Sequence, residues 1–338
     1  MYMNILQQLA EASKGKAKFT TRNDSIKGKA ICIYGRSDCG KTSVCSKLPN
    51  PVFIPLERGL AATSNILTLP TSSWADIEAH LRLLKSKQWV DIVQSTEEPV
   101  CIVVDGAEKL VKYAERRVLS DAGVTEIAKA GAMGQGYKKM ENLVVNFLMD
   151  LLNLDYTIIF ICHEQVDEEG YINLKGDKKR NIDPIVENCD IVAWLEPRPL
   201  DEDGRPGLSK AHFFAGEYFF ARSRFIEMDS SLDPFTAEGL IRVIEEGIRR
   251  QNEKDGISSS SFEKRNEAYV SNFDLTFDEA LDKCYEMMDK LDELNKSDLV
   301  DEVIIKHLGE LDNFKTLKPS QLESLQGIYE ELEDILGE

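Results

Sequence analysis

The chain has 338 residues, of which 42% are hydrophobic and 30% are charged, an ordinary composition for a globular protein. Its net charge of −18 is uneven: residues 267–338 hold 20 acidic and 6 basic side chains, whereas the preceding residues hold 39 and 35. No apolar run reaches the ~20 residues of a membrane helix, and the seven cysteines include no CxxC pair. We therefore expect a cytoplasmic protein with reduced cysteines, no membrane contact and no zinc site.

The chain opens with a short predicted helix. Apolar residues at Ile5, Leu6 and Leu9 follow helical spacing, and a basic, polar stretch extends from there to residue 29. Residues 1–28 are thus interpreted as an N-terminal helix and a basic connection.

Five short apolar runs come next, at residues 30–34, 52–56, 100–104, 157–162 and 191–195. Such runs suit buried parallel strands, and helical periodicity at 74–84 and 137–151 places helices between them. Apolar segments at 212–214 and 218–225 flank Ala215-Gly216-Glu217, which predicts a hairpin at the sheet's edge. A helix over 237–250 follows. The order of elements predicts an α/β fold with a mainly parallel sheet.

The last part of the chain differs in composition. Residues 251–265 include the run Ser258 to Ser261 and show no apolar periodicity, which is typical of a linker. Phe277, Leu281, Tyr285 and Leu291 then recur at helical spacing. The sequence predicts a core domain over 29–250, a linker over 251–265 and a small acidic all-helical domain over 266–338.

One motif carries most of the functional information. Residues 35–42 satisfy GxxxxGK[ST], directly after a predicted strand and before a predicted helix. In such a loop the backbone N–H groups surround phosphate oxygens, the lysine reaches the β- and γ-phosphates and the hydroxyl ligates magnesium. We therefore expect ATP and Mg²⁺ as cofactors, bound by Gly35, Arg36, Ser37, Asp38, Cys39, Gly40, Lys41, Thr42 and the adjacent Ser43.

Two carboxylates complete the predicted site. A P-loop metal needs a second ligand at the end of a neighbouring strand, and Asp105 follows the run Val100 to Val104. Hydrolysis also needs a group that orients or deprotonates water, and Glu57 closes the predicted strand at 52–56. A solvated glutamate beside Arg58 is the alternative for Glu57.

The order of these segments resembles the RecA-type core ATPases, and most closely the phage-encoded RecA-like proteins associated with single-strand annealing and recombination. The resemblance covers about residues 30–227 and rests on the P-loop, Lys47-Leu48-Pro49-x-Pro51, Glu57, Asp105 and the strand leading to His163-Glu164. It implies a RecA-like core, water activation by Glu57 and a γ-phosphate sensor at His163, which could also be only structural. The sequence departs from the family pattern at Cys39, Pro55 and Gly106.

The same resemblance implies a homo-oligomer, either ring or filament, with nucleotide between subunits. Arg222 and Arg224 lie two residues apart on a predicted strand, so their side chains share a face. In RecA-type assemblies a basic pair at such a position reaches the neighbouring subunit's γ-phosphate, as an arginine finger does. Charged residues that protect an edge strand are the alternative interpretation.

Two basic segments suit single-stranded DNA. Residues 175–180 follow His163 where related ATPases place a DNA-contacting loop, and residues 129–139 combine three glycines with Tyr137. Lysines with an interleaved aromatic favour backbone contact and base stacking, although lysine-rich loops are often only solvated surface. The predicted DNA contacts are Lys138, Lys139, Lys175, Lys178, Lys179 and Arg180.

These features predict an ATP-hydrolysing, RecA-like protein that acts on single-stranded DNA in phage-type recombination, annealing or replication, in the bacterial host's cytoplasm if it is phage-encoded. A small-molecule kinase would use the same P-loop but needs an acceptor pocket and an arginine-rich lid. A nucleotide-binding switch or scaffold without DNA is a further alternative, in which the acidic C-terminal domain recruits a protein partner.

Overall fold

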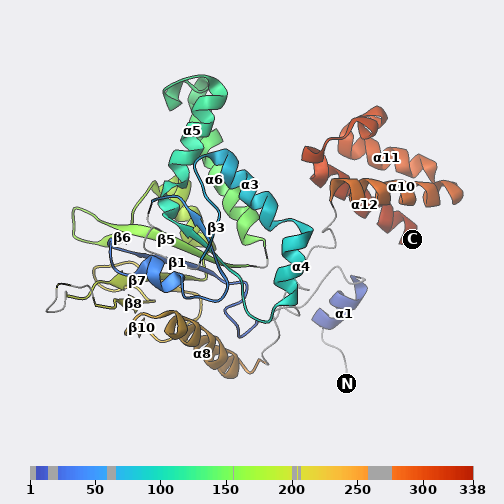
Figure 1. Cartoon of the computed structure of the whole chain (residues 1–338). Helices are drawn as coiled ribbons and strands as arrows, with labels where there is room; N and C mark the ends of the chain where they lie inside the picture. The colour runs from blue at the N-terminus through green and yellow to red at the C-terminus, as the bar shows by residue number, and fades with distance from the viewer. Residues whose placement is uncertain are drawn as a thin grey trace. The chain divides into compact units, whose positions relative to one another are not determined.

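The computed structural model describes residues 5–13, 22–58, 66–154, 156–199, 204, 207–257 and 276–337 (Figure 1). The chain divides into two compact units. One spans Thr21–Glu263, and the other combines Met1–Thr20 with Lys264–Glu338. The predicted N-terminal helix is present as α1 (Ile5–Ala12). None of the helices in the described ranges combines the length and hydrophobicity needed to span a bilayer.

A mostly parallel sheet forms the centre of the Thr21–Glu263 unit and confirms the predicted fold class. Its main path runs β10-β8-β7-β1-β5-β4-β2-β3, and the segment from β7 to β3 is parallel throughout. All five predicted strands are present. The strands are β1 (Ala30–Gly35), β2 (Pro51–Pro55), β3 (Leu67–Thr68), β4 (Cys101–Asp105), β5 (Thr157–Val166), β6 (Ile172–Leu174), β7 (Ile191–Glu196), β8 (Lys210–His212), β9 (Arg222–Ser223) and β10 (Ser231–Leu232).

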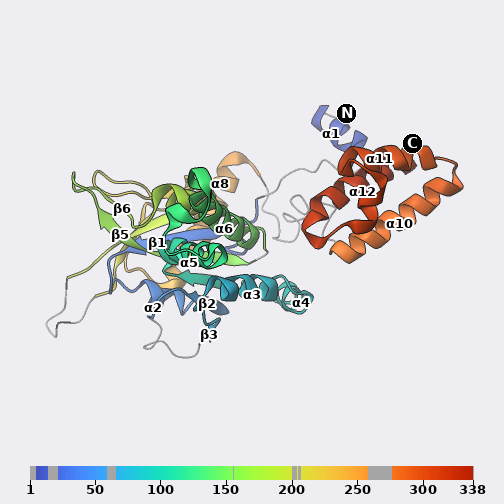
Figure 2. The same ribbon diagram turned by 90° about the horizontal axis from the view of Figure 1, so that it is seen from above.

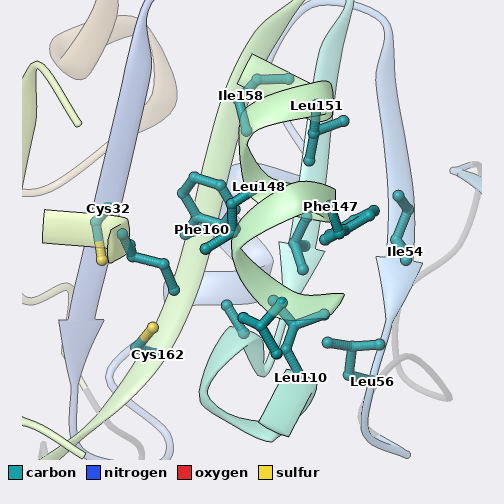
Figure 3. Close-up of a cluster of buried hydrophobic side chains, with 14 of the residues drawn as sticks. Cys32, Ile54, Leu56, Leu110, Phe147, Leu148, Leu151, Ile158, Phe160 and Cys162 are labelled. Carbon is teal, nitrogen blue, oxygen red and sulfur yellow. The ribbon is translucent and has the colours of Figure 1, made fainter. Parts of the chain in front are cut away.

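Helices cover both faces of this sheet (Figures 1 and 2). Side chains of β1 alternate between two apolar cores, with Cys32 and Tyr34 in one and Ile31 and Ile33 in the other. In the first core, α6 lays Phe147, Leu148 and Leu151 over the central strands (Figure 3). The helices of this core are α3 (Trp74–Leu84), α5 (Leu110–Ala122), α6 (Gln135–Leu152) and α7 (Asp183–Asn188). Helix α4 (Lys87–Ser95) packs against α3. The second core lies under α2 (Lys41–Cys45) and α8 (Ala237–Asp255).

The antiparallel edge differs from the predicted hairpin. Strand β8 pairs with β7 on one side and β10 on the other, while β9 pairs with the amino end of β7. The segments at 212–214 and 218–225 therefore do not form a two-stranded hairpin with each other. Buried aromatics explain the apolar pattern, since Phe219 stacks on Trp194 and Phe213 is fully buried in the other core.

Two predicted boundaries also shift. Residues 22–29 pack with the sheet unit, because Ile26 is buried in its core and Arg22 donates to Asn252 and Asp255 of α8. Helix α8 continues to Asp255, five residues into the predicted linker, and ends where Gly256 adopts a left-handed conformation. The rest of that predicted linker, residues 258–265, lies outside the described residues.

The C-terminal part of the second unit is helical, as predicted. It contains α10 (Phe277–Glu293), α11 (Ser297–Leu308) and α12 (Leu322–Gly337) around a separate apolar core. Thr276 and Glu279 form a reciprocal capping box at the start of α10. A core of its own is the requirement for a segment that folds independently.

All seven cysteines lie in described parts of the chain, and all are unpaired and buried. Burial raises the pKa of the thiols of Cys39, Cys45, Cys101, Cys189 and Cys284. They therefore behave as small apolar side chains that fill the cores.

Candidate functional site

The loop between β1 and α2 wraps around the Lys41 ammonium group. Gly35 has no space for a side chain, because a Cβ there would lie 3.0 Å from both Cys39 Sγ and the Leu195 carbonyl oxygen. Asp38 and Gly40 adopt left-handed conformations, with φ of 63° and 83°. The buried Lys41 donates to the carbonyl oxygens of Gly35 (2.8 Å) and Arg36 (2.6 Å). The loop geometry is that of a P-loop, whose backbone turns around a concave centre.

The other residues of this loop differ in how exposed they are to solvent. Arg36, Ser37, Asp38 and Ser43 are exposed, and Thr42 is half-buried. Cys39 is buried, and its carbonyl oxygen accepts a 2.8 Å hydrogen bond from Ser209 of the segment before β8. This hydrogen bond ties the Cys39 backbone, and with it the loop, to the segment before β8.

The side chains of Thr42, on α2, and Asp105, at the end of β4, are in contact. The Thr42 hydroxyl donates to Asp105 Oδ2 at 3.1 Å, and the aspartate is 1% exposed. Its other oxygen, Oδ1, is buried without a hydrogen-bond partner among the described residues. Burial and then the negative charge of Glu57 raise the pKa of Asp105 to about 6. A buried carboxylate oxygen with no partner beside a hydroxyl fits a hard cation such as Mg²⁺, which prefers oxygen ligands.

Strand order brings the predicted residues together. Strand β5 lies between β1 and β4, and β2 pairs with the far side of β4. In register, Gly35 lies opposite His163, and Asp105 lies opposite Pro55, two residues before Glu57. The carboxyl ends of β1, β5, β4 and β2 therefore share one edge, the usual location of ligands in open parallel sheets.

Glu57 does not stand free at this edge. Its Oε2 forms an ion pair with the ammonium group of Lys109, which belongs to the short helical turn η2 (Ala107–Lys109) after β4. Gly106 at the start of this turn has φ of 81°, and a Cβ there would lie 3.3 Å from Glu57 Cγ and Cδ. Glycine at position 106 thus allows the turn to approach Glu57 closely.

His163 is held by a second residue of the same turn. Its Nδ1 lies 2.7 Å from Glu108 Oε1, whose side chain is 7% exposed. Although burial opposes ionisation, the hydrogen bond from His163 and the nearby positive charges hold the pKa of Glu108 below its usual value. Glu57, Glu108 and His163 offer ligand atoms within 4.8 Å of one another, yet Lys109 and the His163–Glu108 bond already engage them.

Sequence reasoning missed Glu108 and Lys109. They lie three and four residues after Asp105 in a segment without a motif. Only this short separation in sequence indicates that they lie at the same edge of the sheet as Asp105. Their partners, His163 and Glu57, are more than 50 residues away in sequence. Those pairings become visible only in the folded chain.

Arg222 and Arg224 lie at the opposite end of the sheet. Strand β9 pairs with Ile191 and Val192 at the amino end of β7, whereas Gly35 aligns with Leu195 at the other end. Both guanidinium groups donate to the Glu187 carbonyl oxygen, at 3.4 Å and 2.7 Å respectively. The two arginines thus lie beside Glu187, away from the P-loop of their own chain.

The two basic segments lie side by side. Lys138 and Lys139 are exposed on the first turns of α6, and the helical segment η5 (Lys178–Ile182) packs against this helix. Arg180 lies over the Tyr137 ring, 5.0 Å from its centroid, and pairs with Asp177. Lys178 and Lys179 at the start of η5 are exposed, and so is Lys175 just before it. The structure thus unites residues that were predicted from two separate stretches.

The chain is similar to known proteins. The AAA domain family matches residues 27–225, the stretch from three residues before β1 to just beyond β9. The chain is also similar to the SPbeta prophage-derived uncharacterized protein YorG of Bacillus subtilis. The two are 33% identical over 315 residues, which cover 93% of this chain and 95% of the relative.

Proposed function

The chain belongs to the AAA domain family of P-loop nucleotide-binding proteins, and on that premise we propose that it is a magnesium-dependent ATPase of the RecA-like phage type. The observation that carries this proposal is the convergence of Lys41, Thr42, Asp105 and Glu57 on one sheet edge. A position for phosphate, two oxygen ligands for a metal and a carboxylate for water are the parts that phosphoryl transfer to water requires.

Each side chain has a distinct role in this proposal. Backbone N–H groups of residues 35–42 and the Lys41 ammonium group bind the phosphates. Thr42 and Asp105 hold Mg²⁺, which when bound neutralises charge on the phosphate oxygens. Glu57 orients or deprotonates the attacking water, and His163, fixed at Nδ1 by Glu108, presents its other ring nitrogen as the γ-phosphate sensor.

We further propose single-stranded DNA as the ligand of the surface formed by Lys138, Lys139, Lys175, Lys178, Lys179 and Arg180. The Tyr137–Arg180 stack supplies a planar group among exposed cations, a combination that suits stacked bases and a phosphate backbone. The prophage origin of the similar protein supports a role in phage-type recombination, annealing or replication.

The proposal includes assembly into a homo-oligomer with nucleotide at the subunit interface. Arg222 and Arg224 lie at the sheet edge opposite the P-loop, so a role at phosphate must concern another subunit's nucleotide. The acidic helices α10 to α12 are proposed to recruit a protein partner. Ring and filament assemblies satisfy this arrangement equally.

The decisive experiment measures phosphate release from ATP with and without oligothymidylate. Glu57→Gln is expected to bind ATP normally but to lose at least about 100-fold in kcat, because an amide cannot accept the proton. Glu97→Gln, an exposed glutamate after α4, is the matched control and should behave as wild type. Normal turnover by Glu57→Gln would place water activation elsewhere.

The same assay separates the other functions. A wild-type protein that binds ATP without releasing phosphate would be a nucleotide switch or scaffold, and one that transfers phosphate only to a small acceptor would be a kinase. For DNA, Tyr137→Ala should weaken oligothymidylate binding by about 5- to 100-fold through lost stacking, while Tyr137→Phe retains it. Equal binding by both variants would remove Tyr137 from the DNA surface.

A further inference from the structure

The turn after β4 contacts two of the residues assigned to catalysis. Lys109 pairs with Glu57, and Glu108 holds the His163 ring. The Lys109 and Glu57 side chains are 34% and 23% exposed, so the pair remains partly accessible to solvent. An ammonium group that holds the Glu57 carboxylate keeps it from turning toward a water molecule at the phosphate.

The same turn is tied to the basic segment at 175–182. Asn181 is fully buried in η5 and donates its side-chain N–H to the Ala107 carbonyl oxygen at 2.9 Å. Gly176 lies against Glu108, because a Cβ at position 176 would come within 3.3 Å of Glu108 Cβ. The Lys175 backbone N–H donates to the His163 carbonyl oxygen at 2.8 Å. Three contacts thus join this segment to the turn after β4 and to His163.

We propose that Lys109 is a positioning residue that restrains Glu57 by its ion pair, and that Asn181 couples release of this restraint to occupancy of the 175–182 segment by single-stranded DNA. The inference rests on the proposed ATPase function and adds its regulation. DNA bound to Lys178 and Lys179 shifts η5, Asn181 carries the Ala107 backbone with it, and Lys109 withdraws from Glu57. Hydrolysis then depends on DNA through one hydrogen bond and one ion pair.

The kinetic test uses the full chain. Lys109→Met removes the ammonium group but keeps the length of the side chain, and is expected to raise kcat without DNA by about 3- to 10-fold and to reduce the stimulation by oligothymidylate equally. Lys112→Met, an exposed lysine one helical turn further along α5, is the control and should leave both values unchanged. A loss of activity in Lys109→Met would overturn the proposal, because it would make the lysine an aid to catalysis.

Asn181→Ala tests the coupling. It should lower stimulation by oligothymidylate while leaving the dissociation constant for that oligonucleotide within about twofold, and it should add nothing to Lys109→Met in the double variant. Additive effects of the two substitutions would contradict a shared route. Tryptophan fluorescence and thermal unfolding establish that Asn181→Ala is folded, and Lys109→Met remains decisive if it is not.

A second readout does not depend on turnover. Acetylation with a lysine-selective reagent, followed by mass spectrometry, should modify Lys109 more slowly than Lys112, and oligothymidylate or Glu57→Gln should abolish this difference. If neither treatment changes the Lys109 rate, the restraint is refuted even when ATP is hydrolysed. If the rates change as expected but wild type releases no phosphate, the proposed hydrolysis fails while the Lys109–Glu57 restraint stands.

Discussion

Replacing Asp105 by asparagine is expected to change how the protein's stability depends on pH. The pKa of Asp105 rises from its ordinary 3.8 to about 6 in the folded chain. Such a shift makes ionisation about 3 kcal/mol more costly in the folded than in the unfolded state. The folded state therefore binds more protons between these two values, and it loses stability as the pH rises through them.

Asparagine does not titrate, so the substitution removes this loss. Relative to wild type, the free energy of unfolding of Asp105→Asn should increase by about 2 kcal/mol between about pH 4.5 and about pH 7.5. The amide oxygen can still accept from Thr42, whereas the amide nitrogen leaves a buried donor that costs about 1–3 kcal/mol at every pH. Only the pH-dependent part of the difference tests the argument.

Urea unfolding in EDTA provides the measurement. The three tryptophans, Trp74, Trp89 and Trp194, all belong to the Thr21–Glu263 unit, so their fluorescence reports on the unit that contains Asp105. Asp91→Asn, at an exposed aspartate on α4, controls for the same chemical change at the surface. A difference that stays constant with pH within about 0.5 kcal/mol would refute the reasoning.

Three further predictions concern nucleotide, assembly and the acidic helices. Lys41→Ala should weaken ATP binding by about 100-fold or more in a folded protein, because it removes the charge that faces the β/γ-phosphates; calorimetry that finds unchanged affinity would remove the P-loop assignment. Arg222→Ala combined with Arg224→Ala should lower kcat but leave ATP affinity intact, and mixing with Glu57→Gln should restore some activity. No recovery in verified mixed assemblies would count against an intersubunit site. A chain ending at Ile257 should keep the tryptophan unfolding transition and its DNA affinity but lose partner recruitment, and an unfolded product would show that the helices belong to the core.

The features that were predictable from sequence are those encoded over short distances. Four or five consecutive apolar residues identify buried strands such as Cys101–Asp105, and the P-loop spacing places Lys41 and Thr42 directly after one of them. Asp105 follows because parallel strands align their carboxyl ends at one edge. Each of these inferences needs only the local pattern and the geometry of parallel sheets.

The rest depends on which distant segments meet. Strands β9 and β10 have two residues each, too few for a pattern to assign their partners, and the apolar residues around them serve packing on Trp194. The position of Arg222 and Arg224 at the far edge follows from that unexpected pairing. Lys109 and Asn181 carry no motif, and only folding brings them to their partners, Glu57 and Ala107.

The seven buried thiols have a practical consequence for experiments on this protein. Thiols that are buried react slowly with maleimides, so the native cysteines can remain in place. A cysteine introduced at an exposed position, for example Lys112→Cys on α5, would then take up a fluorescent dye selectively. A second dye on the α10–α12 helices would allow energy transfer to follow the distance between the two units as nucleotide and oligothymidylate are added.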